Sequence, residues 1–255
     1  PTLGIKEEIA LKLNDSMGLP PALKGLHGLY KKGKVAVIQG VGYPKANRSH
    51  FKSMDIWHSA SPELTYNNGW IGRHVDAIAS QGSANPVVAL GLSGDRPRAL
   101  AGEKFKIPCF ASLADIQAMV GNADAEKMLR QIQGAASSDP NARLVQQASM
   151  SALDSMSALR DKLATFTPKQ QYPNGKFGEG LKQIAQLVAT SPQTRVVYFS
   201  TGGFDTHARQ AESHEKLLQD FGDAIAAFQA EMEAVDKADN VVVMVFSEFG
   251  RRTYE

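Results

Sequence analysis

The sequence predicts an α/β fold with a mostly parallel central sheet and a helical insertion. Two runs of β-branched and aromatic residues, at 196–200 and 241–246, lack polar alternation, as strands buried on both faces do. Between them, apolar residues recur every three or four positions, the pattern of an amphipathic helix. Strand, helix and strand make a βαβ unit, so we expect both strands to be central and parallel.

The composition fits a globular protein of one domain. The chain has 255 residues, of which 43% are hydrophobic and 21% are charged, so we expect a single α/β domain over residues 1–255. The net charge is +2 and the basic residues are scattered, which argues against a nucleic-acid surface. No apolar run approaches the roughly 20 residues of a membrane-spanning helix. Cys109 is the only cysteine, which excludes intrachain disulfides and Cys-rich zinc motifs.

The amino-terminal part alternates helices with strands. Two prolines at 20 and 21 suit the start of a helix, which Gly33 ends before a strand at 35–38. Glycines and a proline then break the chain, and a second helix opens at 47–50. A third helix at 70–78 and a strand at 86–90 continue the α/β order.

The middle of the chain predicts an insertion made of helices. Strand patterns are missing from about residue 113 to 176, where Ala, Gln, Ser, Met and Asp dominate until 164 and suggest two or more helices. Residues 167–178 contain two prolines and two glycines and predict a loop. A helix at 181–189 leads back to the strand at 196–200.

Polar residues follow both of the predicted central strands. Asp205 and His207 come after the first strand, and Glu248 directly follows the second. The carboxyl ends of neighbouring parallel strands lie at one edge of a sheet, where ligands of open α/β sheets bind. We therefore expect the three side chains to converge on one ion or substrate, and their oxygen and nitrogen atoms suit Zn²⁺ or a similar divalent metal.

Each of these residues also has a simpler interpretation. Asp205 would serve as a cap of the following helix, with His207 on the surface. Glu248 would form an ion pair with Arg251 or Arg252. Those arginines could equally bind an anionic substrate, because a guanidinium group matches the oxygens of phosphate or sulfate.

The helix that opens near residue 50 supplies further candidates. Ser49 and His50 lie at its amino terminus, where backbone N–H groups favour an anion. Ser49 is either a nucleophile that uses this field or, together with Asn47, a simple helix cap. The local pattern assigns no definite role to Arg73. Three other histidines show no partner pattern and are predicted to lie at the surface or on helix faces: His27, His58 and His214.

Taken together, these motifs resemble the bacterial family DUF1501, a domain of unknown function. The resemblance covers nearly the whole chain, with 113–176 as its variable part. Its motifs are GFDTH at 203–207 with Gln210, FSEFGR at 246–251, GKVAV at 33–37, SHF at 49–51, DIW at 55–57 and GWIGR at 69–73.

The resemblance implies a three-layer α/β/α fold of the alkaline phosphatase superfamily, alongside the sulfatases. It implies a metal-dependent hydrolase of phosphate or sulfate esters that is exported to the periplasm by a twin-arginine signal, which the sequence does not contain. In such a site Asp205, His207 and Glu248 would ligate one or two Zn²⁺-like ions, and Ser49 would be the attacking hydroxyl or an anion-binding cap. The anionic ester would be bound by His50, Arg73 and Arg251.

We expect both ends of the chain to be cut from a longer protein, because Glu255 falls in mid-motif. The resemblance implies a Gly-Gly-x-Asp motif before Pro1 and an Asp-His motif after Glu255, which would supply further metal ligands. Members of the superfamily often have Asp where this chain has Glu248. The alternative function is a non-catalytic exported binding or assembly protein that retains the fold, and an isomerase or mutase is a third.

Overall fold

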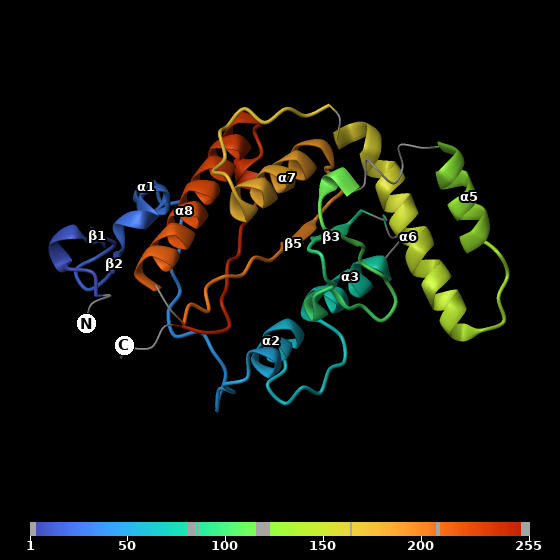
Figure 1. The fold of residues 1–255 in the computed structure, drawn as a ribbon, viewed down its shortest axis with the longest axis horizontal. Helices are drawn as coiled ribbons and strands as arrows, with labels where there is room; N and C mark the ends of the chain where they lie inside the picture. Colours follow the sequence, from blue (N-terminus) through green and yellow to red (C-terminus); the bar gives the residue numbers. More distant parts are fainter. Residues whose placement is uncertain are drawn as a thin grey trace. The chain divides into compact units, whose positions relative to one another are not determined.

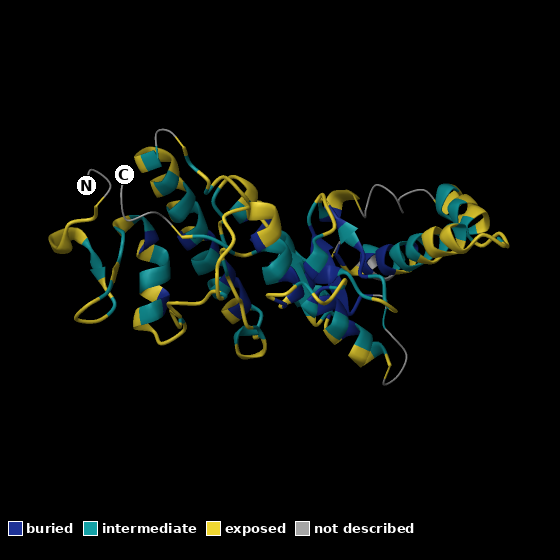
Figure 2. Ribbon diagram, turned by 90° about the horizontal axis from the view of Figure 1, so that it is seen from below, coloured by how far each residue is buried: buried dark blue, intermediate teal, exposed yellow. Residues whose placement is uncertain are grey.

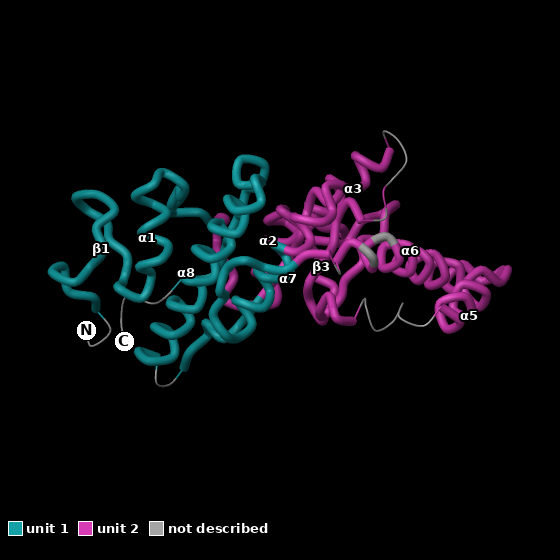
Figure 3. The backbone as a smooth tube through the Cα atoms, turned by 90° about the horizontal axis from the view of Figure 1, so that it is seen from above, with its two compact units in different colours: residues 1–42, 167–185, 201–255 teal, residues 43–166, 186–200 magenta. Residues whose placement is uncertain are grey.

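The computed structural model describes residues 4–80, 85, 87–115, 123–163, 165–207 and 210–250. They form a mixed α/β structure in which helices predominate (Figure 1). The chain divides into two compact units (Figure 3). Unit 1 contains Pro1–Gly42, Thr167–Ala185 and Thr201–Glu255, and unit 2 contains Tyr43–Phe166 and Gln186–Ser200.

Unit 2 contains a parallel sheet of three strands. Strand β3 (Ala89–Leu92) lies between β4 (Cys109–Phe110) and β5 (Val196–Phe199). Both pairings are parallel, which confirms the parallel strand predicted at 196–200. Within the described part of the chain β5 is an edge strand, and its residues are only half-buried. The prediction that this strand is central and buried on both faces is therefore wrong.

The hydrophobic core of unit 2 surrounds β3, all of whose residues are buried (Figure 2). Helix α3 (Trp70–Ala79), predicted at 70–78, contributes Ile71 and Val75. The short 3₁₀ helix η3 (Arg98–Leu100) contributes Leu100. Strand β3, with helix α3 and the 3₁₀ helix η3 packed on it, thus forms the centre of this unit.

Two glycines allow α3 to lie directly on the backbone around η3. A Cβ atom on Gly69 would lie 2.0 Å from the carbonyl oxygen of Arg98, and one on Gly72 would lie 2.2 Å from that of Ala101. The amide of Gly69 also donates a hydrogen bond to the Ala101 carbonyl, at 2.9 Å. Side chains at either glycine would separate the two backbones, so this part of the GWIGR motif has a packing role.

Helices α5 (Ala123–Gln133) and α6 (Pro140–Leu163) occupy the range in which the sequence predicts two or more helices. Polar contacts join them: Glu126 accepts hydrogen bonds from Ser157 Oγ at 2.6 Å and from Arg130 Nε at 2.9 Å. Arg130 also reaches Asp154 at 2.6 Å. The bonds from Ser157 and Arg130 hold the pKa of Glu126 below its ordinary value.

Unit 1 is built mainly from helices. They are α1 (Lys24–Lys31), the first part of α7 (Lys176–Thr190) and α8 (Gln210–Ala234). Near its amino end lie the 3₁₀ helices η1 (Glu7–Ile9) and η2 (Pro21–Leu23) and an antiparallel pair, β1 (Leu11–Lys12) and β2 (Gly18–Leu19). Gly25 brings α1 close to α8, because its Cβ would lie 2.9 Å from the Gly222 carbonyl oxygen.

A buried carboxylate fixes the loop that enters α7. Glu231 of α8 is fully buried, at 0% exposure. It accepts hydrogen bonds from the backbone amides of Lys169, at 3.0 Å, and Gln170, at 2.9 Å. The amides give the buried side chain the hydrogen bonds that it needs, so the predicted loop, which in the structure ends where α7 begins at Lys176, is anchored to α8.

Two predicted strands are not formed in the structure. Residues 35–38 and 241–246 are described, but neither run belongs to a strand. The 3₁₀ helix η4 (Ala238–Asn240) precedes the second run, in which Val242 is 94% exposed, and Ile38 of the first run is 78% exposed. A β-strand needs a neighbouring strand to pair with its backbone, and sequence pattern alone does not supply one. The predicted βαβ unit is therefore present only as β5 and α8.

Among the described residues, no helix combines the length and the apolar composition needed to cross a membrane.

Candidate functional site

The predicted site residues are divided between the two units. Asp205, His207 and Glu248 belong to unit 1. Ser49, His50 and Arg73 belong to unit 2. Arg251 lies outside the described residues.

The structure brings Asp205 and His207 together. Asp205 Oδ2 lies 3.2 Å from His207 Nε2, and the two side chains are 52% and 85% exposed. Gly203, just before them, has φ of 98°, a conformation that favours glycine. A carboxylate oxygen and an imidazole nitrogen are thus presented next to each other and open to solvent.

An aromatic cluster holds the segment that carries this pair. The ring of Phe204 meets Phe177 of α7 edge-on, with centroids 6.2 Å apart. It meets His214 of α8 in the same way, also at 6.2 Å. Phe177 in turn packs on Phe221, at 5.5 Å. These contacts fix the backbone next to Asp205 from one side, because edge-to-face ring pairs have a preferred geometry.

Glu248 lies in a tight turn that follows the exposed run at 241–246. Ser247 Oγ donates to the Phe249 carbonyl at 2.8 Å, and the Phe249 amide donates back to Ser247 Oγ at 3.4 Å. Glu248 itself is half-buried. In the described ranges, no three His, Cys, Asp or Glu side chains lie close enough together to hold a metal ion. The structure does not gather all three predicted ligands, and their assignment stays a prediction.

Ser49 stands at the start of α2 (His50–Ser59), as the sequence predicts. Its side chain makes no capping hydrogen bond, while its carbonyl accepts the Ser53 amide at 2.9 Å. Asn47 organises the turn instead, because its Oδ1 accepts the Ser49 amide at 2.8 Å. The Ser49 side chain is exposed, as are its neighbours His50 and Phe51.

Arg73 is engaged within its own unit. Its Nη2 donates to the Ser59 carbonyl at 2.8 Å, and its Nη1 donates to the Asn68 carbonyl at 3.0 Å. The guanidinium also lies over the Tyr66 ring, 4.3 Å from the centroid. Arg73 therefore closes the loop between α2 and α3, and a substrate would have to share it with these partners.

Sequence reasoning missed a buried histidine that pairs with a tyrosine. His58 is only 8% exposed, and its Nε2 lies 3.1 Å from the hydroxyl of Tyr198 on β5. His58 does lie on a helix, α2, but it is buried there and has a partner for which the sequence shows no pattern. Tyr198 was the available indication, because a phenol in a strand that is predicted to be buried needs a hydrogen-bonding partner.

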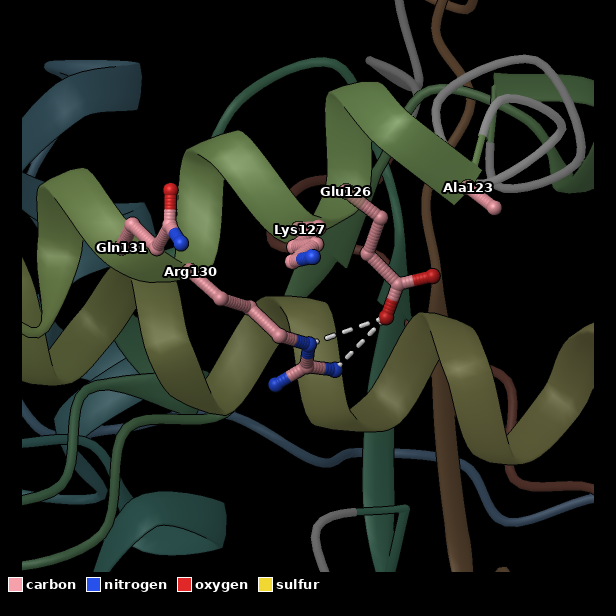
Figure 4. Close-up of a pocket in the computed structure, with 5 residues that line it drawn as sticks. All are labelled: Ala123, Glu126, Lys127, Arg130 and Gln131. Atoms are coloured by element: carbon pink, nitrogen blue, oxygen red, sulfur yellow. Dashed lines mark hydrogen bonds and ion pairs between the residues drawn. The ribbon is translucent and has the colours of Figure 1, made fainter.

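A surface pocket lies along α5 (Figure 4). Its lining residues are Ala123, Glu126, Lys127, Arg130 and Gln131. None of the predicted site residues is among them. Glu126 and Arg130 point toward each other and are already paired, so this pocket is not assigned to the site.

Comparison with known proteins places the chain in a family. No curated protein matches it, and no solved structure matches it. A family model does match residues 36–255, and its description reads "Protein of unknown function (DUF1501)". Because the match covers most of the sequence, the chain belongs to the DUF1501 family.

Proposed function

We propose that this protein is an exported, metal-dependent hydrolase of phosphate or sulfate esters that acts in the periplasm. The observation that carries the proposal is the pair of Asp205 and His207. An oxygen and a nitrogen ligand lie 3.2 Å apart and are exposed on a segment anchored by Phe204. Oxygen and nitrogen ligands of this kind hold catalytic Zn²⁺ and similar ions in hydrolases.

Asp205 and His207 carry ligand atoms that suit a divalent metal, but they would form only part of its coordination shell. Asp205 and His207 would supply two ligands, and a catalytic zinc site takes three from the protein. Glu248 is proposed as the third. A bound metal, or a pair of metals, would polarise the ester and stabilise the charge that develops on its oxygens.

Residues of the chain would perform the remaining steps. Ser49 is proposed as the attacking hydroxyl, because its exposed side chain makes no capping hydrogen bond at the start of α2. His50 and Arg251 would bind the anionic ester, with Arg73 as a further candidate. Charged donors of this kind match the oxygens of phosphate and sulfate.

The proposal includes a finer assignment of the fold. We assign the chain to the alkaline phosphatase superfamily, with a three-layer α/β/α arrangement related to that of the sulfatases. The parallel sheet of unit 2 and the helices packed on it support an α/β class. The resemblance of the GFDTH and FSEFGR motifs supports the finer placement.

Metal analysis of the full-length protein tests the site. We expect the purified protein to contain a divalent metal, and Asp205→Asn and His207→Gln each to lower the metal-to-protein ratio at least about tenfold. His27→Gln is the matched control, because His27 lies in the same unit and its Nε2 contacts a backbone carbonyl, that of Lys12, at 2.9 Å. If both site variants keep the metal content of the control, the assignment of the ligands is wrong.

A further inference from the structure

The contact between His58 and Tyr198 joins two segments that lie far apart in the sequence. His58 is in the last turn of α2, and Tyr198 is in β5. Besides the 3.1 Å hydrogen bond, the two rings meet edge-on, with centroids 6.0 Å apart and planes inclined at 79°. Both residues belong to unit 2. This pair is thus a specific polar attachment between α2 and the sheet.

The charged groups around His58 act on it in opposite directions. Asp55, one turn earlier on α2, forms an ion pair with Arg98 of η3 at 3.3 Å. Arg73 of α3 donates to the carbonyl of Ser59, the next residue along α2. Asp55, which favours a positive charge on His58, is therefore also paired with Arg98, which opposes one.

Burial and these charges act on the proton affinity of the imidazole. Desolvation lowers the pKa of His58 below its ordinary value of 6.5, Asp55 opposes this change, and Arg98 adds to it. Burial also raises the pKa of Tyr198, so the phenol stays neutral. Protonated His58 could still donate from Nε2 to the neutral phenol oxygen, but its positive charge would be buried at 8% exposure without a phenolate to offset it.

We propose that His58 is a proton-sensitive latch that ties α2 to β5 while its imidazole is neutral and loosens α2 when it becomes protonated. The latch goes beyond the proposed hydrolase function and does not depend on it. Its consequence reaches the opposite end of α2, where Ser49 and His50 lie. Loosening of α2 would thus also affect that helix start.

The direction of the pH effect follows from the lowered pKa. The unfolded or loosened form takes up a proton near pH 6.5, whereas the latched form takes it up only at lower pH. The contribution of the latch is therefore complete above 6.5 and is lost as the pH falls from there through the pKa of the folded state.

Hydrogen exchange of the full-length protein tests the latch. Exchange of the α2 amides, corrected for intrinsic rates, should be faster at pH 5.5 than at pH 7.5, while α3 in the same unit should show no such difference. His58→Gln keeps a hydrogen-bonding group but cannot titrate, so it should abolish the pH difference in α2. His27→Gln should behave like the unmodified protein.

Two further results decide the proposal. Tyr198→Phe should already exchange faster in α2 at pH 7.5, because the attachment is missing. If His58→Gln does not fold, a nuclear magnetic resonance titration of the unmodified protein replaces it, and the His58 pKa should then lie below 6.5. An α2 that exchanges equally at both pH values, or a His58 pKa above 6.5, would overturn the latch whether or not the protein binds metal.

Discussion

At the residue scale, the informative side chains are polar groups that are buried although they lie on helices. Glu231 lies on an amphipathic helix at a fully buried position and meets two backbone amides. His58 lies on α2 and meets a phenol. Neither partner is near in sequence, so neither could be predicted from local spacing. Asp205 and His207 were found from the sequence because both members of the pair follow one strand.

Glu231→Ala tests the role of the buried carboxylate. The change leaves the amides of Lys169 and Gln170 without their acceptor, which should lower the free energy of unfolding by about 1–3 kcal/mol per unsatisfied buried group. Urea denaturation measures the loss. Glu233→Ala is the control, because Glu233 is exposed on the same helix and should change the free energy by no more than about 0.5 kcal/mol. Equal midpoints for the two variants would contradict the anchoring role.

At the scale of the element, helices were predictable and strands were only partly so. Helices α1, α3 and α8 follow the three- and four-residue apolar repeat that their sequences show. Helix α2 forms where predicted but buries Ser53, His58 and Ser59, whereas Phe51 is 87% exposed. Its fully buried residues are therefore polar, and the apolar pattern cannot reveal that.

Gly72→Ala tests the close packing of α3 on the backbone near η3. The new Cβ would lie 2.2 Å from the Ala101 carbonyl oxygen, so the free energy of unfolding should fall by about 1–3 kcal/mol. Gly28→Ala on α1 is the matched control, because no atom lies within 4 Å of its Cβ position. That change should instead add about 0.5–1 kcal/mol through helix propensity. A neutral Gly72→Ala would show that the two backbones can separate at no cost.

The hairpin of α5 and α6 should respond to acid. Hydrogen bonds from Ser157 and Arg130 lower the pKa of Glu126 below its ordinary value of 4.5. Its contribution is therefore complete above pH 4.5 and is lost as the pH falls through the lower pKa of the folded state. Amide exchange of α5, corrected for intrinsic rates, should accelerate over this range. In Glu126→Gln this acceleration of exchange at low pH should disappear. If the acceleration persists, a group other than Glu126 causes it.

At the scale of the whole molecule, the sequence predicted the α/β class and the parallel sheet but not the extent of that sheet. The runs at 35–38 and 241–246 have strand composition, yet both are mostly exposed and lie outside any strand. Composition shows that a segment is suited to a sheet, while its pairing depends on distant strands. For the same reason, spacing alone could not decide whether Glu248 meets Asp205 and His207.

The proposed three-layer fold makes a prediction at this scale. It would use residues 241–246 as a strand of a larger sheet, so their amides should exchange as slowly as those of β5. Val242→Lys would then place a charge in a packed sheet and should lower the free energy of unfolding by about 2–4 kcal/mol. Rapid exchange together with an unchanged unfolding midpoint would contradict the three-layer fold and agree with the 94% exposure of Val242.

Turnover of an aryl phosphate and an aryl sulfate by the full-length protein tests the central claim most directly. Turnover of at least one ester should be lost after treatment with a chelator and restored by adding Zn²⁺ or a similar ion. Asp205→Asn and His207→Gln should each reduce it at least about tenfold, and His27→Gln should not. Bound metal without turnover of either ester would favour a non-catalytic binding protein. Turnover that persists in the presence of the chelator would contradict the metal-dependent mechanism.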